Sequence, residues 1–185
     1  MSLVGAPATV DSTGGAEFSV DVIGDASVGT HMGGGGFYLT SGSDPMIENI
    51  SWTPAPWNSF ADDGGYAGNG DYNLVVFGQI IPPFHSEPEP GSELGSSIGT
   101  FHITIADGAS GQLDLGFVED HDLPFSLEVW EWEPGDGNTS GRIAEAFHDT
   151  EGQLSLNGAS VTVVPTGPSL AVLGLGGGLL SRRRR

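Results

Sequence analysis

Short apolar runs separated by glycine and proline limit the fold of this chain more than any other feature. The 31 glycines and 12 prolines are spread along the sequence, and helices tolerate neither residue well in their interiors. Several runs alternate apolar and polar residues, most clearly residues 18–22 and 101–105. A period of two places every second side chain on one face, which is the pattern of a half-buried strand. The sequence therefore predicts an all-β fold.

About eight such runs occur, a number typical of a two-sheet sandwich. Besides the two above, they are residues 37–40, 47–52, 74–80, 113–117, 125–130 and 154–164. We therefore expect a two-sheet antiparallel β-sandwich of jelly-roll type. The Asp107-Gly108 pair supplies the positive φ of a tight turn, so residues 107–111 are predicted to be a hairpin loop between antiparallel neighbours. Residues 82–90 contain four prolines and are predicted to be an exposed loop.

Charge is segregated along the chain. The net charge is −19, there is no lysine, and the basic residues are Arg142 and four arginines at the C-terminus. Without that terminal block, 24 acidic side chains stand against Arg142 alone, and such a body repels the phosphates of nucleic acids. The absence of cysteine excludes disulfides and thiolate metal sites. We expect no nucleic-acid partner.

Residues 164–185 form a tail of three parts. It opens with Val164, Pro165, Thr166, Gly167 and Pro168, and its prolines interrupt the preceding strand. Residues 170–180 are uncharged and are expected to form a short hydrophobic helix. The tail ends with Arg182, Arg183, Arg184 and Arg185, a block that stays on the cytoplasmic side of a membrane. Eleven residues at about 1.5 Å each reach only about 16 Å, so we expect transient anchoring in the membrane.

This order of proline motif, apolar stretch and arginine cluster resembles the PEP-CTERM protein-sorting signal of Gram-negative bacteria. The resemblance implies that an exosortase, a membrane-embedded cysteine transpeptidase, cuts near the proline motif and passes the protein to the cell surface or to extracellular polysaccharide. Val164 and Pro165 match the start of the family's Val-Pro-Glu-Pro pattern, and Pro168 is its second proline displaced by one position. Thr166 and Gly167 replace the glutamate. Residues 1–7 are not a signal peptide, and we expect one upstream.

Residues 1–163 form the predicted acidic domain. In order and pattern, residues 16–23, 36–40, 99–105, 111–117 and 157–164 resemble the β-sandwich of cohesins and carbohydrate-binding modules. The resemblance implies an adhesion or saccharide-binding role on the cell surface or in the extracellular matrix. We expect this domain to have no enzymatic activity.

A cluster of acidic and amide residues is a candidate calcium site. Asp62, Asp63, Asn69 and Asp71 lie within a glycine-rich stretch, where the backbone can fold back and bring oxygen ligands together. The spacing is not that of an EF-hand. The alternative is a solvated turn-rich loop. No other cofactor is indicated.

Two tryptophans are candidates for stacking on sugar rings. Trp130 and Trp132 are two positions apart and would share one face of a strand. Aromatic faces can pack against the apolar faces of pyranose rings. The alternative is that the core of the sandwich uses these large side chains.

No catalytic motif stands out. The five histidines, His31, His85, His102, His121 and His148, show no metal-binding spacing, and no serine lies in a nucleophile elbow. A pair of carboxylates for glycoside hydrolysis cannot be chosen among 24 acidic residues. Two alternatives therefore stay open beside the binding domain: a secreted glycan-active enzyme and a calcium-stabilised structural domain.

Overall fold

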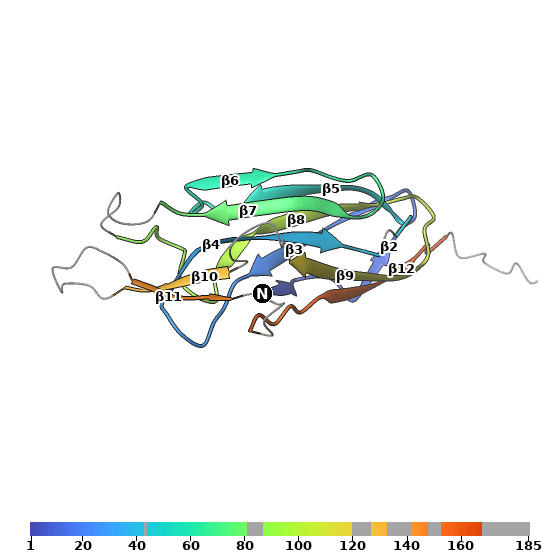
Figure 1. Ribbon diagram of the computed structural model, residues 1–185. Helices are drawn as coiled ribbons and strands as arrows, with labels where there is room; N and C mark the ends of the chain where they lie inside the picture. Colours follow the sequence, from blue (N-terminus) through green and yellow to red (C-terminus); the bar gives the residue numbers. More distant parts are fainter. Residues whose placement is uncertain (43, 81–86, 120–126, 133–141, 148–152, 168–185) are drawn as a thin grey trace, which may run out of the picture.

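The computed structural model describes residues 1–42, 44–80, 87–119, 127–132, 142–147 and 153–167 (Figure 1). Within these residues the chain forms twelve strands and no helix. They are β1 (Ser2–Val4), β2 (Thr9–Asp11), β3 (Ala16–Ile23), β4 (His31–Thr40), β5 (Ile47–Pro54), β6 (Phe60–Asp63), β7 (Tyr72–Gly78), β8 (Ser97–Ile105), β9 (Gly111–Glu119), β10 (Leu127–Glu131), β11 (Arg142–Phe147) and β12 (Ala159–Val164). The all-β prediction is confirmed. The predicted C-terminal helix lies outside the described residues.

The strands form two sheets. The first has the order β1-β3-β8-β5, and all of its pairs are antiparallel. The second has the order β11-β10-β4-β9-β12-β2, with β7 also paired to β4, and β6 to β7. One described pair departs from the antiparallel prediction, because β12 runs parallel to β2. These two strands are far apart in the sequence, and a local sequence pattern carries no information about such a pairing.

The register shows that β9 and β10 lie on the same edge of β4. Glu119 is opposite Phe37, and Leu127 is opposite Gly35. Both Gly35 and Phe37 have β7 on their other side. The strand that begins as β9 therefore resumes as β10 after residues 120–126. On the far side, β12 pairs with β9 and β11 pairs with β10 in the same way.

The core lies between the two sheets, and Phe37 of β4 is at its centre. Its ring is fully buried and contacts Trp52 and Phe101 of the first sheet at centroid distances of 5.8 and 6.2 Å. It also contacts Phe77 and Phe117 of the second sheet at 6.0 and 5.4 Å. The pairs with Trp52, Phe101 and Phe117 are edge-to-face, and such pairs add about 0.5–1.5 kcal/mol beyond area burial. This cluster fastens one sheet to the other.

The predicted hairpin at residues 107–111 is wrong. The turn forms, with Gly108 at a φ of 69°, but β8 belongs to the first sheet and β9 to the second. The loop is a corner that crosses between sheets. It is fixed to the turn after β2, because Asp107 Oδ1 accepts a bond from Gly14 N (2.7 Å) and Ser12 Oγ donates to Ala109 O (2.6 Å). An Asp-Gly pair specifies a turn but not the sheet in which the next strand lies.

A second buried contact lies over the glycine-rich part of β4. Trp130 is fully buried without belonging to the core between the sheets, and its Nε1 donates to Glu128 Oε1 (3.0 Å). A Cβ atom at Gly33 would lie 2.3 Å from that nitrogen and 3.0 Å from that oxygen. Glycine at position 33 is therefore required by the close approach of the tryptophan.

We predict that Gly33→Ala lowers the free energy of unfolding by about 1–3 kcal/mol, the usual cost of overpacking. Gly116→Ala is the matched control, because a Cβ there would meet only Thr40 Cγ2 at 3.8 Å. Its effect should stay within about 0.5 kcal/mol. Urea unfolding followed by tryptophan fluorescence measures both. Equal stability of the two variants would contradict the packing of Trp130 on β4.

Candidate functional site

The predicted sorting motif begins at the last residue of the last strand. Val164 ends β12 and lies opposite Asp11 in the parallel pair with β2. Its carbonyl oxygen accepts a bond from Ser12 N (3.1 Å). Pro165, Thr166 and Gly167 follow and are exposed. Figure 1 shows β2 and β12 at one end of the sandwich.

The side chain of Asp11 holds the motif against the body. Thr166 N donates to Asp11 Oδ1 at 3.0 Å, and Thr166 Oγ1 donates to Asp11 Oδ2. Asp11 Oδ1 also accepts from Thr13 N (3.0 Å). These bonds hold the pKa of Asp11 well below its usual range, and the bond from the Thr166 hydroxyl makes the largest contribution. They do so because they favour the ionised carboxylate. Asp11 was not among the predicted site residues.

The rest of the predicted tail lies outside the described residues. This holds for Pro168 and for the four arginines, Arg182, Arg183, Arg184 and Arg185. In the part of the chain that the structure describes, no helix is long and apolar enough to cross a membrane.

The four predicted calcium ligands flank a β-hairpin at the edge of the second sheet. Asp62 and Asp63 end β6, and Asn69 and Asp71 precede β7. Each of the three carboxylates accepts bonds from the protein. Asp63 Oδ1 accepts from Gly65 N (3.0 Å) and Tyr72 OH (2.5 Å), and Asp62 Oδ1 accepts from Asp63 N (3.0 Å). Burial, followed by the bond to Asp63, raises the pKa of Tyr72 above its usual range.

The structure brings only part of this set together. Asn69 and Asp71 are bonded to each other, with Asn69 Nδ2 3.4 Å from Asp71 Oδ2. Asp71 Oδ1 also accepts from Ser41 N (2.8 Å) and Thr40 Oγ1 (3.0 Å). Among the described residues, no three His, Cys, Asp or Glu side chains gather as metal ligands do. Calcium binding by these four residues stays a prediction.

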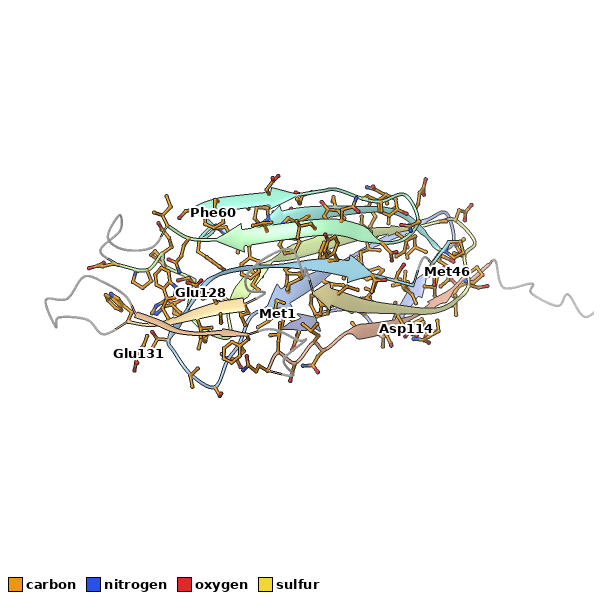
Figure 2. The ribbon with its side chains drawn as sticks, in the orientation of Figure 1. Met1, Met46, Phe60, Asp114, Glu128 and Glu131 are labelled. Atoms are coloured by element: carbon orange, nitrogen blue, oxygen red, sulfur yellow. The ribbon has the colours of Figure 1, made fainter. Side chains whose placement is uncertain are left out.

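The two predicted stacking tryptophans have different environments. Trp130 is 1% exposed and offers no face to a sugar, so its predicted role is wrong. The reason is the glycine-rich strand beside it, which admits the ring. Trp132 is half-buried and meets the His31 ring edge-on at 6.0 Å. Its backbone N donates to Thr30 Oγ1 (3.0 Å). Figure 2 shows Glu128 and Glu131, which flank Trp130, at the same end of the molecule.

Thr30 links His31 to β10. Its Oγ1 lies 2.9 Å from His31 Nδ1 and 3.3 Å from Trp130 O. Burial lowers the pKa of His31, against the opposing charge of Glu93. The neutral ring is thus favoured near pH 7.

A polar ladder on the outer face of the first sheet was not predicted. His102 of β8 bonds Ser19 of β3 through Nδ1 (2.9 Å) and Thr53 of β5 through Nε2 (3.2 Å). Thr100 Oγ1 donates to Asp21 Oδ1 (2.6 Å) on the same face. The second ring nitrogen meets a hydroxyl and not a carboxylate, so the ladder lacks the orienting acid of a hydrolase triad. Each residue sits at a polar position of its strand, but only the sheet order joins them.

A cavity of about 440 Å³ lies at the N-terminal strand, lined by Met1, Asp25, Phe147, Leu154 and neighbouring polar residues. The amino group of Met1 donates to Ser155 O (2.7 Å). Burial lowers its pKa, opposed by the charge of Asp25. The wall is mixed in character and presents no cluster of catalytic groups among the residues described.

The strand order and the aromatic core define an all-β protein of two packed sheets. No protein-family model matches the sequence, and no curated protein matches it. The structure is similar to that of the seventh ScaB type I cohesin from Pseudobacteroides cellulosolvens. The TM-score is 0.43 and the sequence identity is 15%, over 87% of this chain and 90% of that chain.

The calcium prediction has a direct test. An ion that binds only the folded state stabilises it, by about 2.7 kcal/mol at a hundredfold excess over Kd. Millimolar calcium is therefore expected to raise the Tm of the wild type relative to chelator, and to leave the Tm of Asp71→Asn unchanged. Asp107→Asn, which removes a carboxylate far from this hairpin in sequence, should respond like the wild type. Differential scanning calorimetry measures the shift in Tm. A wild-type Tm that is the same with calcium and with chelator contradicts the site.

Proposed function

We propose that the chain is an exported, non-enzymatic surface or extracellular-matrix protein that an exosortase sorts and processes through residues 164–185. The observation that carries this proposal is the position of the proline motif. Residues 165–167 are exposed and directly follow the last strand. All twelve described strands precede residue 165, so cleavage after the motif would leave every one of them in the body.

The proposed reaction is a transpeptidation. A cysteine thiolate of the exosortase attacks the carbonyl carbon of a peptide bond near the motif. That bond breaks, the amine of the arginine-bearing fragment takes up a proton, and the body stays on the enzyme as a thioester. An acceptor amine or water then attacks the thioester and releases the thiolate. The body contributes no catalytic group to these steps.

The charge distribution supports this order of events. The four terminal arginines favour the cytoplasmic side of the inner membrane, whereas the acidic body gains nothing from anionic lipid headgroups. The short apolar stretch between them is suited to brief anchoring. Once the tail is removed, the arginines no longer hold the body at the membrane, and its acidic side chains are repelled by anionic lipid.

We predict that the chain, expressed behind a secretion signal in an exosortase-containing host, loses its arginines. Intact-mass spectrometry of the exported protein should place the new C-terminus near residues 164–168. In an otherwise identical host without the exosortase, the tail should remain. Replacement of the four arginines by alanine should reduce processing, because the stop that holds the motif at the membrane is lost. An intact arginine tail on exported protein from the first host contradicts the proposal.

Saccharide binding by the body is a second candidate, favoured by Trp132 and His31. Trp132 is partly exposed, and an indole face can pack on a pyranose ring. The His31 ring lies 6.0 Å from that of Trp132, and an imidazole can donate or accept a bond with a sugar hydroxyl. Together they provide one stacking surface and one hydrogen-bonding ring.

Trp132→Ala is expected to weaken glycan binding about tenfold or more, because it removes the stacking surface. Trp132→Phe should keep most of the affinity. Trp57→Phe is the control, since Trp57 is 3% exposed and its indole bonds Ser97 O inside the body. The sugar used as the probe is selected with a glycan array, and its affinity for each variant is measured by isothermal titration calorimetry. Unchanged affinity in Trp132→Ala contradicts this site, and hydrolysis of the glycan would favour the enzyme alternative.

A further inference from the structure

The sorting motif is folded onto the body at its first residues. Val164 is part of β12, and its carbonyl is bonded to Ser12 N at 3.1 Å. Thr166, in the middle of the motif, is held through both its amide and its hydroxyl by Asp11. Asp11 lies 155 residues away in sequence. The parallel pairing of β2 with β12 brings it to this point.

A peptidase cannot use this arrangement directly. The substrate must enter the enzyme's cleft as an extended segment, with its backbone free to bond the enzyme. The Thr166 amide is instead occupied by a carboxylate of the body, and Val164, two residues earlier, pairs with β2. Residues 164–166 must therefore separate from the body before cleavage. When such opening is fast, the rate of proteolysis follows the population of the open form.

We propose that Asp11 restrains processing: its contacts with Thr166 keep the motif closed, and the exosortase acts on the fraction of molecules in which these contacts are broken. The inference rests on the proposed function and adds a positioning residue outside the tail. The carboxylate is ionised at neutral pH, because the same hydrogen bonds lower its pKa. Charged acceptors form the stronger bonds to amide and hydroxyl donors.

Asp11→Ala is the variant that tests the restraint. It leaves every residue of the tail unchanged, so the enzyme meets the same motif. Processing is expected to be about three- to tenfold faster than in the wild type, the range that corresponds to the net contribution of one typical hydrogen bond. Asp11→Asn keeps the shape of the side chain and one acceptor oxygen. Its rate of processing should lie between those of the wild type and Asp11→Ala. This variant separates the loss of the hydrogen bonds from a folding defect.

The matched control is Asp107→Ala. Asp107 is also an exposed carboxylate that accepts a backbone amide bond, from Gly14 at the same end of the body. Its removal changes the net charge by the same amount without touching the tail. Processing of Asp107→Ala should equal that of the wild type. Urea unfolding of each variant checks that the body remains folded.

Two readouts keep the inference apart from the proposed function. The first is the rate at which the tail is lost in the exosortase-containing host, followed by mass spectrometry after a pulse of synthesis. The second needs no enzyme: hydrogen exchange of the Thr166 amide, measured by NMR on the purified full-length chain. That amide should be protected in the wild type and in Asp107→Ala, and should exchange about three- to tenfold faster in Asp11→Ala.

Faster processing and faster exchange in Asp11→Ala, with Asp107→Ala unchanged, support the restraint. Processing of Asp11→Ala at the wild-type rate overturns it and leaves the proposed function standing. An unprotected Thr166 amide in the wild type overturns it as well. If no variant is processed, the wild type included, the proposed function fails, and the role of Asp11 in processing fails with it.

Discussion

The packing of Phe37 between the two sheets is the contact on which the other features depend. Its ring meets aromatic residues of both sheets, and removing a buried phenylalanine typically costs about 3–5 kcal/mol. Outside that core, Gly33 of β4 lets Trp130 pack close to the backbone. With the sheets fixed, the polar ladder of His102 is presented on one outer face, and the junction of β2 with β12 is placed at one end.

The period-two pattern predicted strands well where each strand has one buried face. Residues 18–22 and 101–105 lie within β3 and β8, with Val20, Phe101 and Ile103 buried as the alternation requires. β1, β2 and β6 were missed because strands of three or four residues carry too few positions for a period to show. β11 was missed although it has six residues. The corner after β8 was misread because turn chemistry is local, whereas the choice of sheet is not.

The candidate site also combines features that the sequence predicts with features that it does not. The tail was predicted from the composition and order of residues 164–185 alone, and its sorting role stays a prediction. The contacts of Asp11 with Thr166 could not be predicted, since nothing near Asp11 in the sequence distinguishes it from the other acidic residues. Trp130 and Trp132 have the same residue type and the same parity, yet one is buried and the other is partly exposed. The difference comes from Gly33, which lies on another strand.

The parallel pair of β2 and β12 also limits the order in which the strands of the second sheet can pair during folding. β2 has no other strand partner among the described residues, so residues 9–11 must wait for residues 162–164. Pairings between distant parts of a chain form slowly. During synthesis, the second sheet therefore stays open at this edge until residues 162–164 have emerged. The strand that closes this edge is β12, and it leads directly into residues 165–167.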